Sequence, residues 1–138
     1  MSILRALPLF AVVWVVYNLV AVVSGSAETL QGGLFSLNLI SGATWTINVG
    51  ELLIILALVA LFIEVFKATR TSAVSVLDHM LSTLVFIAFL VEFITVKDAG
   101  NSIFFILTVM SLMDVIAGFS VTIVTARRDF TVGEGANL

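Results

Sequence analysis

Five ionisable side chains stand inside long apolar stretches of this sequence, and their types could support chemistry. They are Glu64, Asp78, His79, Glu92 and Asp114. Placing a charge in hydrocarbon is costly, so groups of this kind face the interior of a helix packing or water, where they find partners. Carboxylates and an imidazole can take up and release protons near neutral pH. The chemistry they favour is therefore the transfer of protons or small cations.

The depths of these groups follow from a rise of 1.5 Å per helical residue. Asp114 falls within about 3 Å of the middle of its apolar stretch. Glu64, Asp78 and His79 fall about 8–10 Å to one side, and Glu92 falls about 11 Å to the other. Acidic groups at three depths lead to one functional hypothesis, an oligomeric pathway for protons or small cations.

The group of Glu64, Asp78 and His79 also has a structural interpretation. Glu64 can form an ion pair with Lys67, three residues further on, or with Arg70. Asp78 stands in the first two turns of its predicted helix, where the helix dipole favours an anion. His79 can pair with Glu64 at the same depth, or can be a buried histidine with a hydrogen-bond partner of another kind.

Glu92 and Asp114 leave similar alternatives open. Glu92 stands near the end of its predicted helix, where it can be protonated, paired with Lys97, or hydrated from outside. Asp114, in the middle of its stretch, must be neutral or paired, and Asn18 is the expected hydrogen-bond partner if the role is structural. The polar side chains expected to support these groups are Asn18, Ser82 and Ser111.

The apolar stretches that position these groups read as membrane spans. Hydrophobic residues make up 61% of the 138 positions and charged residues 11%, whereas a soluble domain carries about 25% charged residues. An α-helix needs roughly 20 residues to cross a bilayer. The sequence predicts four spans, at about 3–24, 49–67, 72–96 and 101–126, and a polar tail over 127–138. The expected fold is a single domain, an antiparallel four-helix transmembrane bundle.

The connection between the first two spans predicts a β-hairpin over about 34–49. Apolar and polar residues alternate there on both sides of Ile40-Ser41-Gly42, which suits a three-residue loop that ends on glycine. This register sets Leu37 opposite Trp45 and places all the apolar side chains on one face. That face must lie on the bundle, in the headgroup layer or on a partner. Its residues are Phe35, Leu37, Leu39, Trp45 and Ile47.

Basic residues predict the orientation of the chain in the membrane. Arg5, Lys67, Arg70, Arg127 and Arg128 fall at the two termini and in the middle loop, whereas the opposite connections hold only Lys97. Because basic residues are retained in the cytoplasm, both termini are expected there and the hairpin outside.

The remaining composition excludes several classes of function. The chain has no cysteine and one histidine, so we expect no metal site, no cofactor and no iron–sulfur cluster. No GxSxG, P-loop or dinucleotide motif occurs, and the net charge of −3 has no basic stripe that would suit nucleic acid.

The first functional hypothesis is accordingly a non-enzymatic accessory, assembly or scaffold subunit. It would sit in the lipid bilayer, in keeping with a bacterial inner membrane, and bind a membrane-protein partner or another copy of itself through its bundle or hairpin. The proton or small-cation pathway is the alternative.

Overall fold

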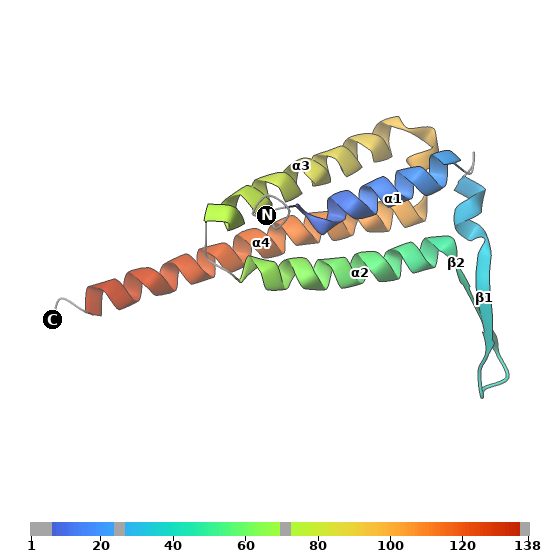
Figure 1. Cartoon of the computed structure of the whole chain (residues 1–138), viewed down its shortest axis with the longest axis horizontal. Coiled ribbons are helices and arrows are strands. Elements are labelled where there is room, and N and C mark those ends of the chain that lie inside the picture. Colours follow the sequence, from blue (N-terminus) through green and yellow to red (C-terminus); the bar gives the residue numbers. More distant parts are fainter. Residues whose placement is uncertain (1–6, 24–26, 70–72, 136–138) are drawn as a thin grey trace.

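The computed structural model describes residues 7–23, 27–69 and 73–135, which form four helices and a hairpin (Figure 1). Along the chain these are α1 (Leu9–Val23), the short 3₁₀ helix η2 (Ala27–Gln31), strands β1 (Gly33–Asn38) and β2 (Thr44–Asn48), α2 (Val49–Ala68), α3 (Ala73–Thr95), the short 3₁₀ helix η3 (Lys97–Ala99) and α4 (Ser102–Gly135). The structure is therefore mostly helical, as expected, with one antiparallel pair of strands.

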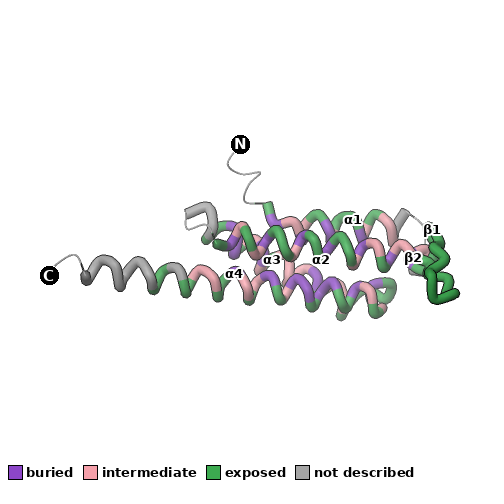
Figure 2. Tube along the Cα trace, turned by 90° about the horizontal axis from the view of Figure 1, so that it is seen from below, coloured by how far each residue is buried: buried purple, intermediate pink, exposed green. Residues whose placement is uncertain are grey.

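The four α-helices lie alongside one another, with α4 next to both α2 and α3 and with α1 against α2 and α3 (Figure 1). Figure 2 shows the buried residues on the sides where the helices meet. Aromatic side chains fill the centre, because Phe10, Tyr17, Phe89 and Phe104 are fully or almost fully buried. The outward sides of the helices carry large apolar residues such as Leu58 that remain exposed.

Three of the helices are long and apolar enough to cross a membrane, over Val49–Ala68, Val76–Thr95 and Ser102–Val124. The first helix is shorter than expected. It begins at Leu9, directly after Pro8, and its 15 residues rise about 22 Å, less than the roughly 30 Å of a bilayer's hydrocarbon. Residues 3–6 and residue 24 of the expected first span lie outside the described residues.

The last helix is longer than the sequence indicated. The predicted fourth span ends near residue 126, close to the end of the apolar part of α4 at Val124, but the helix itself continues to Gly135 (Figure 1). A loss of apolar character marks the end of a span and not the end of a helix. The helix can continue because no proline follows, and the chain's only proline is Pro8.

The hairpin has the predicted register. Phe35 pairs with Ile47 and Leu37 with Trp45, and the Leu39 N–H donates to the carbonyl oxygen of Ala43 at 2.9 Å. Four of the five residues of the predicted apolar face are about half exposed: Phe35, Leu37, Leu39 and Trp45. The fifth, Ile47, is only 4% exposed. Only the base of the apolar face is therefore covered by the rest of the described chain.

The start of α2 is fixed by a reciprocal cap. The Asn48 side chain accepts a hydrogen bond from the Glu51 N–H at 2.8 Å, and the Glu51 carboxylate accepts one from the Asn48 N–H at 3.1 Å. This arrangement satisfies two N–H groups that a helix start would otherwise leave unpaired. Because Asn48 is also the last residue of β2, the hairpin continues into α2 without a linker.

Replacing Gly42 by alanine should destabilise the hairpin by about 1 kcal/mol without disturbing the helices. Gly42 has a φ of +86°, which costs a residue with a Cβ about 1–2 kcal/mol, although no atom lies within 4 Å of the added methyl group. Amide hydrogen exchange should become faster in β1 and β2 only. Equal acceleration in α2 and α4 would contradict this prediction, and Ser41→Ala is the matched control.

Candidate functional site

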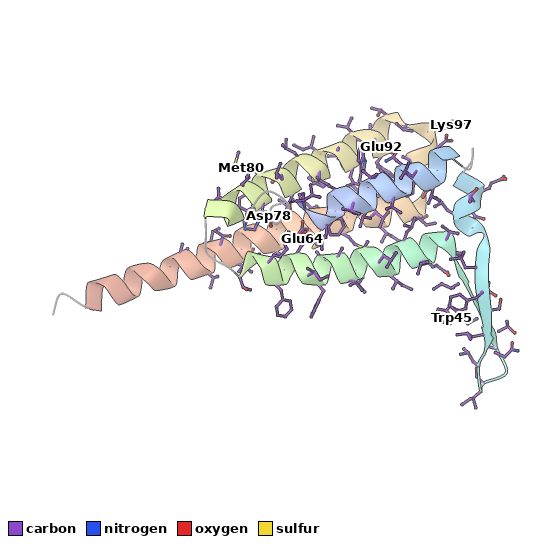
Figure 3. The ribbon with its side chains drawn as sticks, viewed as in Figure 1. Trp45, Glu64, Asp78, Met80, Glu92 and Lys97 are labelled. Carbon is purple, nitrogen blue, oxygen red and sulfur yellow. The ribbon has the colours of Figure 1, made fainter. Side chains whose placement is uncertain are left out.

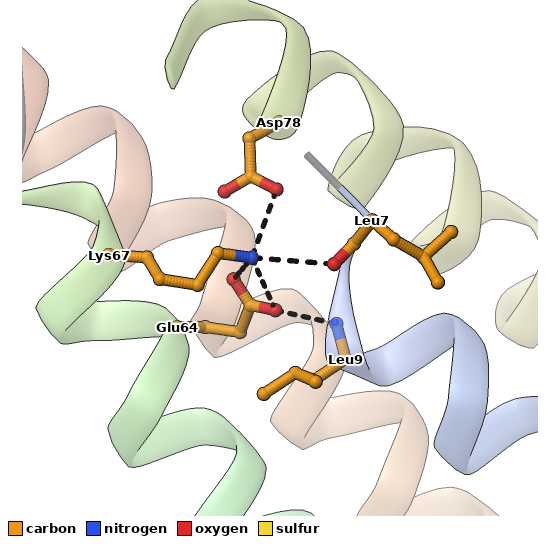
Figure 4. Close-up of polar contacts among 5 residues, drawn as sticks. All are labelled: Leu7, Leu9, Glu64, Lys67 and Asp78. Carbon is orange, nitrogen blue, oxygen red and sulfur yellow. Dashed lines mark hydrogen bonds and ion pairs between the residues drawn. The ribbon is translucent and has the colours of Figure 1, made fainter. Parts of the chain in front are cut away.

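The most extensive polar contacts of the helix packing centre on Lys67, near the end of α2 (Figure 4). Its ammonium lies 2.9 Å from Glu64 Oε2 and 3.3 Å from Asp78 Oδ1, and it donates to the carbonyl oxygen of Leu7 at 3.4 Å. Glu64 and Asp78 are both buried, whereas the Lys67 side chain is 26% exposed. We call Glu64, Lys67 and Asp78 the inner cluster.

The inner cluster joins three segments that are distant in the sequence. Glu64 and Lys67 share a face of α2 because they are three residues apart, and Asp78 reaches Lys67 from α3. Glu64 also accepts a hydrogen bond from the N–H of Leu9, the first residue of α1, at 2.5 Å. The first N–H groups of a helix lack partners inside it and carry its positive dipole, so a carboxylate there caps α1. The cluster thus fixes the start of α1 against α2 and α3.

Asp114 on α4 is buried, and the Ser82 side chain of α3 interacts with its carboxyl group. Its Oδ2 is buried and has no hydrogen-bond partner among the described residues. The expected partner, Asn18, does not contact Asp114 and instead donates to Glu92. Ser82 and Ser111 are both buried, but Ser111 donates to the Thr108 carbonyl oxygen of its own helix at 2.7 Å.

His79 is buried against α4. Its Nε2 lies 2.8 Å from Thr122 Oγ1, and its ring stands 5.8 Å from that of Phe119. Glu64, for its part, binds Lys67 and the Leu9 N–H. The sequence suggested that His79 could pair with Glu64. In the structure, His79 Nε2 instead contacts the Thr122 hydroxyl group of α4.

Gly118→Ala should destabilise the protein by about 1–3 kcal/mol, because the new methyl group would lie only 2.6 Å from His79 Nδ1 and force the imidazole to move. Ser120→Ala, on an exposed side of the same helix, is the matched control. Unfolding in detergent micelles, followed by circular dichroism, measures both variants. Equal stability of Gly118→Ala and the wild type would show that the imidazole is not held in this position.

A second group of polar contacts lies toward the other end of the helices, around Glu92 on α3. Trp14 Nε1 donates to Glu92 Oε2 at 2.6 Å, and Asn18 Nδ2 donates to the same oxygen at 3.2 Å. We call Trp14, Asn18 and Glu92 the outer cluster. Of the alternatives for Glu92, the pairing with Lys97 is not the arrangement found, because α1 supplies the hydrogen-bond donors. Likewise, Asn18 serves Glu92 and not Asp114.

The turn between α3 and α4 is tied to α1 close by. Asn101 Nδ2 donates to the Tyr17 hydroxyl oxygen at 2.7 Å and to the Asp98 carbonyl oxygen at 2.8 Å. The Asn101 side-chain oxygen accepts from the Phe104 N–H at 3.0 Å, which caps α4. A cavity of about 260 Å³ opens beside this turn, lined in part by Tyr17, Glu92 and Asp98.

Aromatic side chains form a continuous buried set in the centre of the helix packing. The ring centroid of Phe89 lies 6.5 Å from that of Phe10 and 5.3 Å from that of Phe104. The ring centroids of Phe104 and Tyr17 are 4.5 Å apart. We call these four residues the aromatic column. Phe10 follows Leu9, which contacts the inner cluster, and Phe89 is one helical turn from Glu92. The column is therefore a continuous set of buried rings that runs from Tyr17, beside the outer cluster, to Phe10, next to the inner cluster.

The arrangement offers structural pairing more than it offers reaction chemistry. Among the described residues, no three or more histidine, aspartate or glutamate side chains are grouped so that they could hold a metal ion. Glu64, Asp78 and Glu92 each have a basic or N–H partner on another helix. Within the described part of the chain, Asp114 is the one acid with a buried oxygen that lacks a hydrogen-bond partner.

The fold and its polar clusters define a small, mostly helical protein with three helices that could cross a membrane. Comparison with known proteins adds no narrower class: no protein-family model, curated protein or solved structure matches the chain.

Sequence reasoning identified the carboxylates but missed most of their partners. It anticipated the ion pair of Glu64 with Lys67, because both stand on one helix. It missed Trp14 as a donor to Glu92, although an indole N–H deep in an apolar helix needs an acceptor and so gave a signal. It also missed the cap on Leu9, because nothing in the local sequence indicates which distant carboxylate will reach a helix start.

Proposed function

We propose that the chain is an integral membrane protein whose four helices form an antiparallel transmembrane bundle. The short α1 belongs to the fourth span, since the inner cluster holds the start of α1 beside α2 and α3. The hairpin and η3 lie at one end of the packing, and the end of α2 and the start of α3 lie at the other (Figure 1). Both termini and Lys67 face the cytoplasm of a bacterial inner membrane.

Within this membrane we propose a non-enzymatic accessory or scaffold role, in which the bundle binds a membrane-protein partner. The observation that carries the proposal is an apolar groove of about 190 Å³ between α1 and α2. Its lining is formed by Leu9, Val12, Val13, Val16, Leu53, Leu56 and Ala60. Side chains of a partner's transmembrane helix fit such a groove, because membrane helices associate by close packing where small residues such as Ala60 let them approach.

The internal use of polar groups supports this role. The ionisable side chains of the inner and outer clusters form contacts between helices. The outward surfaces of the helices carry large apolar side chains. An accessory subunit needs a defined shape and a contact surface, and both are features of this structure. Affinity then comes from complementary packing in the membrane.

Photocrosslinking in the native membrane tests this proposal. A photoreactive amino acid at Val16 or Leu56, in the groove, should give one discrete adduct with a second protein. The same amino acid at Leu84, on α3 and not among the residues that line the groove, is the matched control and should react with lipid. Lipid adducts alone at all three positions would refute a partner in the groove.

A pathway for protons or small cations is the second candidate, favoured by the unsatisfied Oδ2 of Asp114. A buried carboxyl group with a free oxygen is a place where a proton can reside. The aromatic column weighs against a route through a single chain, so water would have to pass between copies in an oligomer. Loss of proton flux into proteoliposomes on Asp114→Asn would favour this candidate, and unchanged flux would eliminate it.

A further inference from the structure

The hairpin runs across the direction of the helices and extends sideways beyond them (Figure 1). In the view turned by 90°, the hairpin is again confined to one end of the packing (Figure 2). β2 passes into α2 at Asn48 through the reciprocal cap with Glu51, so the direction of the hairpin is fixed relative to α2. If the helices cross a bilayer, the hairpin therefore lies along the membrane plane, at the level where α2 begins.

The two faces of the hairpin differ sharply in polarity. Register places Phe35, Leu37 and Trp45 on one face, and the pairs Ser36–Thr46 and Asn38–Thr44 on the other. The polar face is held together by its own hydrogen bonds, 2.7 Å between Ser36 and Thr46 and 3.0 Å between Thr44 and Asn38. The apolar side chains at the centre of the hairpin remain about half exposed.

The apolar face is turned toward the side of the hairpin where the helices lie. Figure 3 shows the Trp45 side chain on the side of the hairpin along which α2 extends. Ile47 belongs to the same face and is buried where the hairpin meets the helices. Since Leu37 is directly opposite Trp45, the exposed part of this face points to where a bilayer surrounding α2 would have its surface.

We propose that the hairpin is an interfacial membrane anchor whose apolar face lies in the boundary between lipid headgroups and acyl chains. This inference rests on the transmembrane placement of α2 and is independent of a partner in the groove. Tryptophan is enriched at this depth of a bilayer, because its ring is apolar and its N–H is polar. The exposed part of the apolar face begins directly beyond the buried Ile47, next to the start of α2, so lipid that surrounds α2 can reach it.

The composition of the hairpin also limits how deeply it can enter the bilayer and which lipids it requires. A two-stranded sheet has two open edges, whose N–H and C=O groups need water and cannot enter hydrocarbon. Residues 33–48 contain no charged side chain. The anchor is thus held by apolar contact, it should not require anionic lipid, and zwitterionic phosphatidylcholine vesicles suffice to test it.

Spin-label accessibility in such vesicles tests the proposal with adjacent residues on opposite faces. The chain has no native cysteine, so Leu37→Cys and Asn38→Cys can each carry a single nitroxide. Collisions with oxygen, which concentrates in lipid, should dominate at Leu37. Collisions with a water-soluble nickel complex should dominate at Asn38. The pair Phe35→Cys and Ser36→Cys repeats the test at a second position, and Leu84→Cys on α3 reports whether the helices are in lipid.

Two results would overturn the anchor. If the nickel complex dominates at Leu37 and Phe35 as well, the hairpin stands in water. If the labels at Leu37 and Phe35 are shielded from both oxygen and the nickel complex, protein covers the apolar face. In vesicles that contain only the purified protein, that covering protein is a second copy of the chain. In either case oxygen dominance at Leu84 would leave the transmembrane proposal intact, whereas nickel dominance there would show that the transmembrane proposal itself had failed.

Discussion

Lys67→Met should destabilise the protein by about 3 kcal/mol, the largest effect expected from a change outside the aromatic column. The substitution keeps an unbranched side chain but leaves Glu64 and Asp78 buried without their shared cation. Removing one partner of a buried ion pair costs about 3–5 kcal/mol, and the partial exposure of Lys67 favours the lower end. Unfolding of the micelle-embedded protein by a denaturing detergent, followed by circular dichroism, measures the loss.

Two further variants separate charge from packing in the inner cluster. Lys67→Arg keeps the cation and should retain most of the stability. The triple variant Glu64→Gln, Lys67→Met and Asp78→Asn removes the uncompensated charges and should recover part of the loss, because neutral groups are far cheaper to bury than unpaired charges. A triple variant less stable than Lys67→Met alone would contradict a structural role for this cluster.

Phe104→Ala should destabilise the protein by about 3–5 kcal/mol, because it removes the ring that links Phe89 to Tyr17 in the aromatic column. Phe104 is fully buried, so truncation leaves a cavity that surrounding helices can fill only in part. Unfolding in the same detergent assay measures the loss.

The neighbouring Phe105 provides the control for this prediction. Phe105 is 50% exposed and faces outward, where lipid or detergent replaces the lost ring. Phe105→Ala should therefore cost much less than Phe104→Ala. Similar losses for the two variants would mean that the column is not the packed centre of the protein.

Features of the fold that depend on neighbouring residues could be predicted from the sequence, whereas features that depend on distant residues could not. The hairpin register and the loop at Gly42 followed from residues a few positions apart, and the structure confirms them. The end of α4 did not follow, because a loss of apolar character at residue 126 says little about the helix itself. The start of α1 at Leu9 depends on Glu64, which is 55 residues away.

The candidate site shows the same division. Glu64, Asp78, His79 and Asp114 were identified because ionisable groups are rare in apolar stretches, and all four are buried. Their partners depend on how the helices rotate and cross, which a periodic pattern in one helix leaves undetermined. For that reason Trp14 and Thr122 became partners where Lys97 and Glu64 had been considered.

The membrane topology is the central claim, and labelling of single cysteines in intact cells tests it most directly. Four variants of the cysteine-free chain suffice: Ser41→Cys in the hairpin loop, Asp98→Cys in η3, Thr69→Cys after α2 and Ala126→Cys on α4. A membrane-impermeant maleimide should label Ser41→Cys and Asp98→Cys from outside, and the other two only after the membrane is permeabilised. Labelling of positions 41 and 69 from the same side of an intact membrane would contradict a transmembrane α2 and the account built on it.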